Sequence, residues 1–276
     1  MEVISSVPVL RERLIKEASV AFVPTMGNLH EGHLDLVRIA LQHAQCVVVS
    51  IFVNPLQFGA NEDFGKYPRT LQEDCDKLKA CGVAVVFTPT EADLYPQPQQ
   101  VMVEPPSVAQ ELCGAFRPGH FKGVATVVLK LLNIVQPQVA VFGKKDYQQL
   151  YVVHKMVEQL NLPVHIVGVE TRRAADGLAL SSRNQYLSTV ERTEATFLYQ
   201  ILMEIQIALK NGAKNHAQLE EKATKKLDSH GWQVEYIAIR SQASLQAAEP
   251  GECELVVLAA ARLGNTRLID NLEVCL

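Results

Sequence analysis

Short apolar runs alternate with longer amphipathic stretches along the first part of the chain. The apolar runs have the length of strands and lie at residues 20–23, 46–53, 83–87, 138–142 and 164–169. The stretches at 33–44, 71–80, 123–135 and 146–160 carry apolar residues at helical spacing. The continuous run CVVVSIFV at 46–53 is typical of a strand that is buried on both faces. This alternation predicts an α/β fold, with a Rossmann-like parallel sheet and crossover helices.

The pattern changes towards the C-terminus. Residues 91–119 are rich in Pro, Gln and Gly, which predicts loops. Amphipathic helices are expected at 189–209 and 216–229, and strands at 232–239 and 254–261. We therefore predict a Rossmann-like domain at 1–185 and a smaller C-terminal α+β domain at 186–276.

Composition narrows the class of protein and its partners. With 48% hydrophobic and 20% charged residues, the chain of 276 residues has the balance of a soluble globular protein. Its formal net charge of -4 gives no electrostatic reason to expect nucleic-acid binding. We therefore expect small-molecule substrates as partners, and no nucleic acid.

The cysteines and the N-terminal residues bear on the compartment. The six cysteines are scattered, without a C-x-x-C pair, which favours neither a zinc knuckle nor a disulfide framework. The first residues lack the basic-then-apolar order of a secretory signal. No apolar segment approaches the ~20 residues of a membrane helix. We expect a cytoplasmic protein that does not enter a membrane.

The stretch VPTMGNLHEGHLDL at 23–36 carries the first candidate chemistry. It places His30 and His33 three residues apart at the turn between a predicted strand and a predicted helix. The simplest interpretation is that both are ordinary polar residues at a helix start. Zinc ligation is a second interpretation, but H-E-x-x-H is absent and only Glu31 and Asp35 lie nearby as further ligands.

A third interpretation is phosphate binding. A helix start offers unpaired N–H groups and the positive end of the helix dipole, while Gly27 and Gly32 let backbone approach a ligand closely. Imidazoles there can donate hydrogen bonds to phosphate oxygens, and their pKa is expected near the working pH. Neither G-x-x-x-x-G-K-[ST] nor G-x-G-x-x-G occurs, so this is a different nucleotide site from the P-loop or the dinucleotide fingerprint.

The motif P-T-M-G-x-L-H-x-G-H resembles the H-x-G-H signature of the nucleotidyltransferase superfamily, and its flanks are similar to the pantothenate synthetase family. Five further blocks agree with this family: SIFVNPLQF at 50–58, YPRT at 67–70, RPGHFKGVATVV at 117–128, FGKKDYQQL at 142–150 and DGLALSSRNQYL at 176–187. The resemblance implies ATP-dependent condensation of (R)-pantoate with β-alanine to pantothenate, AMP and pyrophosphate. It also implies a pantoyl-adenylate intermediate, nucleotide and pantoate binding in the first domain, and a homodimer.

The resemblance assigns roles to individual residues. His30, His33, Lys145 and Arg183 are implied to be catalytic, with His33 at the position given the proton-donor role. Without a ligand, Lys145 would be a solvated lysine at a helix start, where a cation is mildly unfavourable; Lys144 could face water. The loop of Ser181, Ser182 and Arg183 resembles the family's counterpart of the mobile K-M-S-K-S loop of class I aminoacyl-tRNA synthetases. The sequence SSRN could also be an ordinary polar loop. The full ATP-binding set comprises Met26, Gly27, Asn28, Leu29, His30, Glu31, Gly32, His33, Gly143, Lys144, Lys145, Asp146, Val169, Leu180, Ser181, Ser182 and Arg183.

Pantoate and the metal complete the implied site. Gln57 and Gln149 match positions that hold pantoate, although a buried glutamine can also simply bond backbone. Mg²⁺ is expected, since ATP arrives as its complex and the ion neutralises the departing pyrophosphate. Asp74, with Glu73 beside it, lies where the family places an acidic contact to the metal, but a solvated helix face explains QEDCDK equally well.

Two other functions stay open at this point. One is a nucleotidyltransferase of cofactor biosynthesis that retains the adenylyl group on its product. The other is a nucleotide-binding module without turnover. Product analysis separates the first from a ligase, because a ligase releases AMP.

Overall fold

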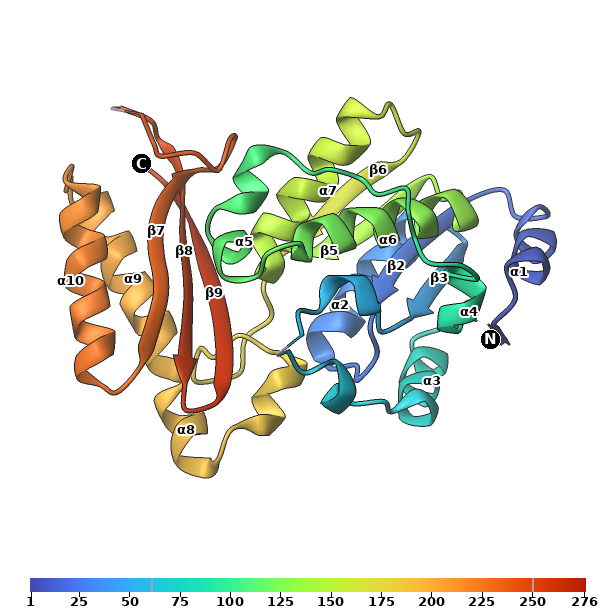
Figure 1. Cartoon of the computed structure of the whole chain (residues 1–276), viewed down its shortest axis with the longest axis horizontal. Helices are drawn as coiled ribbons and strands as arrows, with labels where there is room; N and C mark the ends of the chain where they lie inside the picture. The colour runs from blue at the N-terminus through green and yellow to red at the C-terminus, as the bar shows by residue number, and fades with distance from the viewer. Residues whose placement is uncertain (61, 250) are drawn as a thin grey trace.

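The larger sheet forms the centre of the N-terminal part of the chain, in the right half of the view in Figure 1. The computed structural model describes residues 1–60, 62–249 and 251–276. Within them six parallel strands lie in the order β1-β4-β3-β2-β5-β6. Their bounds are Glu2–Ile4 (β1), Val20–Thr25 (β2), Cys46–Ile51 (β3), Val85–Phe87 (β4), Val139–Gly143 (β5) and His165–Val169 (β6). The predicted parallel sheet is confirmed.

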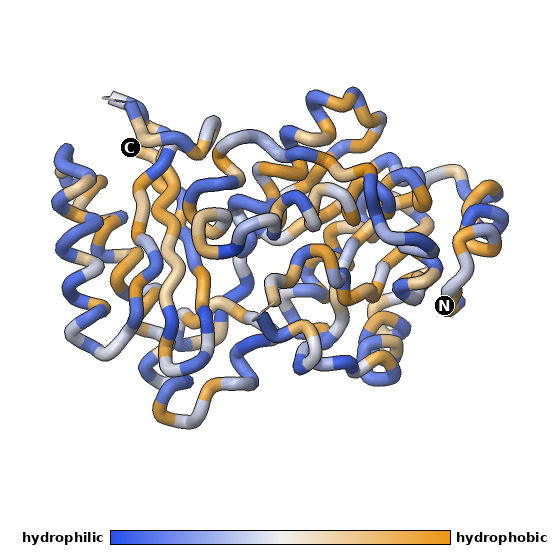
Figure 2. Tube along the Cα trace, in the orientation of Figure 1, coloured by the Kyte–Doolittle hydropathy of each residue, from blue (hydrophilic) through white to orange (hydrophobic). Residues whose placement is uncertain are grey.

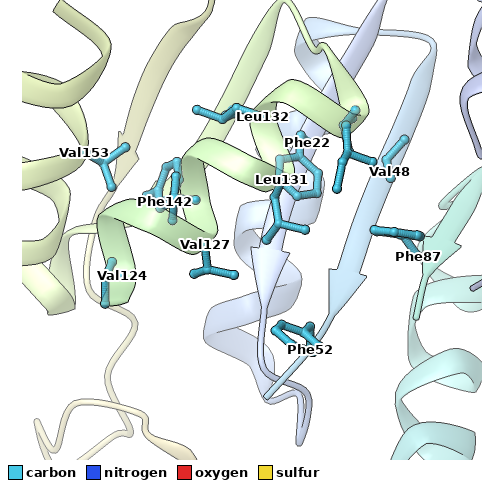
Figure 3. Close-up of a cluster of buried hydrophobic side chains, with 14 of the residues drawn as sticks. Phe22, Val48, Phe52, Phe87, Val124, Val127, Leu131, Leu132, Phe142 and Val153 are labelled. Carbon is cyan, nitrogen blue, oxygen red and sulfur yellow. The ribbon is translucent and has the colours of Figure 1, made fainter. Parts of the chain in front are cut away.

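Helices cover both faces of this sheet. Helices α1 (Val7–Leu14), α6 (His120–Val135) and α7 (Tyr147–Gln159) pack on one face, against a cluster that includes Phe22, Val48 and Phe142 (Figure 3). Helices α2 (Glu31–His43) and α3 (Leu71–Ala80) cover the other face, where Val23 and Val49 are fully buried. Burial on both faces explains why these strands read as continuous apolar runs.

The strand order creates a switch point between β2 and β5. From β2 the chain passes through β3 to β4 on one side, whereas β5 and β6 extend the sheet on the other. The helices that follow β2 and β5 therefore lie on opposite faces. Ligands of open parallel sheets bind outside the carboxyl ends of the strands at such a point.

The smaller sheet belongs to the C-terminal module. Its antiparallel strands are β7 (Gln233–Ser241), β8 (Glu254–Leu263) and β9 (Thr266–Cys275). Helices α9 (Thr196–Lys210) and α10 (His216–Ser229) cover one face, and Figure 1 places them on the far side from the large sheet. The other face packs Leu258 and its neighbours against Tyr147 and Tyr151 of α7. The predicted smaller α+β unit is confirmed, while a boundary at residue 185 stays a prediction.

The remaining segments are short. They comprise the helices α4 (Glu91–Leu94), α5 (Cys113–Phe116) and α8 (Thr189–Glu194), and the 3-10 turns η1 (Pro55–Gln57), η2 (Phe64–Lys66), η3 (Ser107–Gln110), η4 (Lys144–Asp146) and η5 (Ser182–Tyr186). Within the described residues, none of the helices is both long and apolar enough to cross a membrane. Figure 2 shows hydrophobic residues along the sheet strands and mostly hydrophilic ones on α10.

Several sequence-based boundaries were wrong. The sequence did not predict β1, α1 or β9, and the single helix expected at 189–209 is divided at Ala195 into α8 and α9. The predicted loop at 91–119 contains α4, η3 and α5. Helix α6 begins at His120 and not at Gly123, so a glycine lies inside the helix.

Candidate active site

A cavity of about 220 Å³ opens at the carboxyl ends of β2 and β5. Of the predicted ATP and pantoate residues, those that line it are Met26, His30, Gly32, His33, Gln57, Gly143, Lys145, Asp146, Gln149, Leu180, Ser181, Ser182 and Arg183. They come from segments more than 150 positions apart in the chain. The switch point of the sheet thus brings most of the predicted site together.

The turn from β2 into α2 is held by a buried carboxylate. Gly27 and Asn28 have φ values of 84° and 51°, so the chain passes through the left-handed region that favours glycine and asparagine. The two oxygens of the fully buried Asp74 accept hydrogen bonds from the backbone N–H groups of Asn28 (2.8 Å) and Leu29 (2.7 Å). Thr70 donates a third at 3.1 Å. Asp74 therefore fixes the turn that presents the histidines.

The two histidines are oriented by the backbone of the helix start. Nδ1 of His30 accepts from the N–H of Gly32 at 3.1 Å, and Nδ1 of His33 accepts from the N–H of His30 at 3.2 Å. The ring centroids are 4.1 Å apart. Because each Nδ1 is an acceptor, the proton of each neutral ring resides on Nε2. Each ring is thus prepared to donate one hydrogen bond from Nε2 to a ligand.

The protonation state corrects the expectation drawn from sequence. Burial, and then the charge of Lys145, lower the pKa of His30 to about 4. Burial, followed by the charges of His30 and Lys145, lowers the pKa of His33 to about 3. Both rings are therefore neutral donors near pH 7 in the free protein, and the predicted pKa near working pH was wrong.

These shifts predict how stability depends on pH. An unfolded imidazole has a pKa of about 6.5, so below that pH the unfolded chain binds more protons than the folded one. The free energy of unfolding should fall as the pH drops from about 6.5 towards 4. In His33→Asn, the side-chain oxygen can still accept from His30 but no longer titrates, so the fall should be smaller. Urea unfolding at pH 7 and pH 5 measures this fall in the parent and in His33→Asn. An equal fall in both proteins would contradict the lowered pKa of His33.

The two neighbouring lysines differ in their partners. Lys144 Nζ binds Glu170 (2.5 Å) and Glu273 (2.8 Å) and does not line the cavity. Lys145 lines the cavity, and within the described part of the chain its Nζ makes no ion pair. A positive charge without a partner beside two donor imidazoles is suited to an anion. The geometry therefore supports Lys145 as a candidate anion-binding group, while Lys144 joins the large sheet to the C-terminal module.

The loop that follows β6 brings hydroxyl and guanidinium groups to the same cavity. Ser182 Oγ donates to the backbone oxygen of Asn28 at 3.1 Å, which ties this loop to the β2–α2 turn. Arg183 forms a two-bond ion pair with Asp63 at 3.0 and 2.8 Å. A planar guanidinium that can hold a carboxylate in this way can hold a phosphate in the same way.

A chain of polar contacts fixes the end of the cavity that carries Gln57. The buried His120 donates from Nδ1 to the backbone oxygen of Gln57 at 2.8 Å, and its Nε2 accepts from Arg117 at 2.9 Å. Arg117 in turn pairs with Glu62 at 2.6 Å. Burial, and then the charge of Arg117, lower the pKa of His120 to about 4, consistent with this neutral arrangement. Gln57 itself is held by Asn54 at 3.1 Å.

The sequence analysis did not single out these supporting residues. His120 and Arg117 lie in the block RPGHFKGVATVV, and Tyr67 in YPRT, so the quoted blocks were the available signal. Further lining residues that were missed include Asn54, Phe58, Glu170 and Arg172. Asn54 bonds the backbone oxygen of Gly123 and Arg172 pairs with Asp35, contacts between distant parts of the chain that a local pattern does not reveal.

Some predicted site residues do not reach the cavity. These are Gly27, Asn28, Leu29, Glu31, Lys144, Val169 and Asp74. Leu29 is buried in the core below α2, and Gly27 and Asn28 shape the turn. For the predicted ATP residues among them, Lys144 included, contact with ATP stays a prediction.

The described residues do not build a metal site of protein ligands. They contain no group of three or more His, Cys, Asp or Glu side chains placed to hold an ion. Asp74, the predicted metal contact, directs its carboxylate at the backbone of Asn28 and Leu29. Its position supports a structural role in place of the predicted one.

Comparison with known proteins places the chain in a family. The family model described as pantoate-beta-alanine ligase matches residues 2–273. The pantothenate synthetase of Neisseria meningitidis is 60% identical over 275 residues, 99% of each chain. That of Nitrosospira multiformis is 58% identical over 274 residues, 99% of this chain and 98% of the relative.

Solved structures agree with the sequence relatives. The pantothenate synthetase of Thermus thermophilus superposes with a TM-score of 0.95 at 44% identity, covering 100% of both chains. A pantoate-beta-alanine ligase from Francisella tularensis, complexed with beta-gamma ATP and beta-alanine, superposes with a TM-score of 0.84 at 34% identity, covering 99% of this chain and 97% of the relative. The present chain belongs to the pantoate-beta-alanine ligase family.

Proposed function

We propose that this protein condenses (R)-pantoate with β-alanine at the expense of ATP, giving pantothenate, AMP and pyrophosphate. Full-length membership of the ligase family supports this function. One geometric observation carries it: Lys145, which makes no ion pair within the described residues, lines one cavity at the sheet's switch point together with the neutral rings of His30 and His33.

The chemistry requires activation of a carboxylate. A carboxylate resists an amine because oxide would have to leave, so it is first converted into a mixed anhydride. The pantoate carboxylate attacks the α-phosphorus of ATP and pyrophosphate departs. The β-alanine amine then attacks the acyl carbon of pantoyl adenylate, and AMP leaves.

The site residues fit the charge that develops in the first step. Negative charge accumulates on the departing pyrophosphate, and donors that are already aimed at it lower the barrier. Lys145 supplies a fixed positive charge, and the Nε2–H groups of His30 and His33 supply neutral donors. The start of α2 adds the positive end of its dipole. Arg183 joins them if phosphate replaces Asp63 as its partner.

The opposite side of the cavity suits pantoate. Gln57 and Gln149 offer amide groups that can both donate to a carboxylate and accept from a hydroxyl. Beside them, α6 presents an apolar wall of Val124, Val127 and Leu131, which matches the branched aliphatic carbons of pantoate. The cavity thus combines one polar and one apolar surface for the acid.

Mg²⁺, a cytoplasmic location, a homodimer and two domains complete the proposed function. We infer that Mg²⁺ enters on the phosphate oxygens of ATP, because the chain offers no ligand cluster of its own in the described residues. A cytoplasmic location is supported by six free thiols. The homodimer and the domains at 1–185 and 186–276 rest on family resemblance and on the two sheets. Sedimentation of the purified protein would test the dimer.

Isotope exchange tests the proposed function. With pantoate and without β-alanine, the protein should exchange labelled pyrophosphate into ATP. Addition of β-alanine should release AMP and pantothenate. No pantoate-dependent exchange in a folded preparation would refute the adenylation step, and a stable adenylylated product would favour a transferase instead.

A further inference from the structure

Strand β9 brings two buried polar residues, Asp270 and Asn271, to the edge of the active site. Their exposed fractions are 4% and 6%. Burial of polar groups costs free energy unless they are hydrogen-bonded, so each needs a defined partner. Apart from one bond within β9, from the N–H of Asn271 to Asp270 at 2.7 Å, the partners of both side chains lie outside the C-terminal sheet.

Asn271 holds the turn that carries Lys145. Its side-chain Nδ2 donates to the backbone oxygens of Lys144 and Lys145, both at 2.9 Å. These carbonyls lie in the turn η4, between the end of β5 and the start of α7. The amide therefore binds the backbone that carries the Lys145 side chain. Asn271 itself does not line the active-site cavity.

Asp270 holds the segment that leads to the second phosphate-binding loop. It binds Arg173 through two hydrogen bonds, at 2.6 and 2.8 Å. Arg173 also donates to the backbone oxygen of Asn271 at 3.1 Å and stacks over Tyr199 at 3.8 Å. A β-bridge joins Arg173 to Ala179, two residues before Ser181. The same strand thus supports both elements that bring anion-binding groups to the cavity.

We propose that Asn271 is a positioning residue for adenylation, acting on the phosphates through Lys145. This inference rests on the proposed function. The nearby bonds from Lys144 to Glu170 and Glu273 tie the same turn through a side chain. Among the side chains that the structure describes, Asn271 is the one that bonds these two backbone oxygens. A displacement of about 1 Å at a charge contact can lower a rate about 10²-fold.

The test uses two substitutions that remove the amide donor. Asn271→Leu has similar size and no donor, while Asn271→Asp keeps the shape and directs negative charge at the two carbonyl oxygens. In each, the kcat of pantoate-dependent pyrophosphate exchange should fall about tenfold or more, with the KM for pantoate unchanged because Gln57 and Gln149 are not moved. Thermal unfolding shows which of the two variants is folded, and the kinetics are measured on a folded variant.

A matched control and a second background separate positioning from general support. Gln206→Leu removes a similar bond, from an amide on α9 to the backbone oxygen of Glu273 at 3.1 Å, beside the Lys144–Glu273 ion pair but without touching the two oxygens that Asn271 bonds. It should leave exchange within about twofold of the parent. In a Lys145→Ala background, the Asn271 substitution should lower exchange by less than about twofold, because the group that it positions is already gone.

The outcomes are distinct. A tenfold loss in the parent that disappears in the Lys145→Ala background supports the proposal. An equal loss in both backgrounds, a matching loss in Gln206→Leu, or no loss at all in the parent overturns it. Absence of exchange in the unsubstituted protein would instead refute the proposed function.

Discussion

Replacement of Lys145 by alanine should lower the rate of adenylation about 10²-fold or more. Lys145 is the cavity lysine whose charge has no carboxylate partner in the described residues. Burial is the main cause that lowers the pKa of His30 and His33, and the charge of Lys145 lowers both further. A charge close enough to act on the two imidazoles is also placed to act on an anion bound beside them. Pyrophosphate exchange at saturating ATP and pantoate measures the effect.

The form of the loss is also predicted. Because the charge on the leaving pyrophosphate grows in the transition state, kcat should fall while the KM for pantoate stays nearly constant. Lys155→Ala is the control, since Lys155 lies on α7, pairs with Glu158 and does not line the cavity. A loss below about threefold in Lys145→Ala would remove this residue from the phosphate site.

Replacement of Gly123 by alanine should damage both stability and pantoate use. A Cβ at this position would lie 2.1 Å from the backbone oxygen of Leu56 and 2.8 Å from the backbone nitrogen of Gln57. These are backbone atoms, so the segment η1 must move away from α6. Overpacking of this kind costs about 1–3 kcal/mol, which would lower the melting temperature by several degrees.

The displaced segment carries Gln57, so the effect should reach the substrate. We expect kcat/KM for pantoate to fall at least about tenfold, because a shift of about 1 Å in a positioning group is sufficient. Gly65→Ala is the matched control, since a Cβ there meets nothing within 4 Å. Calorimetry and steady-state kinetics measure both properties, and parent-like values in Gly123→Ala would show that α6 and η1 separate without cost.

The same glycine explains one error of the sequence analysis. The apolar residues at helical spacing predicted a helix over 123–135, which would begin at Gly123. The helix begins at His120 instead, because the missing side chain lets α6 approach η1 and lets Asn54 bond the Gly123 carbonyl at 3.3 Å. Tertiary packing thus outweighs local propensity at this position.

Strand β9 was missed for a related reason. A strand with one buried face usually alternates apolar and polar residues, but β9 buries Asp270 and Asn271 side by side. These residues are buried to bind Arg173 and the Lys145 turn, contacts that span 97 and 126 positions. These long-range contacts therefore interrupt the apolar–polar alternation by which the strand would have been recognised.

The sequence by itself determined the parallel sheet, the candidate residues of the β2–α2 turn and the relation to a ligase family, because periodicity and motif spacing are local properties of the chain. The tertiary structure alone decided which charges are available. Neighbours distant in sequence pair Lys144, hold Asp74 against backbone and keep both histidines neutral. Within the part of the chain that the structure describes, they leave Lys145 without a carboxylate partner. Burial and ion pairing are set by such distant neighbours, so local sequence could name the candidate groups but not their charge states or roles.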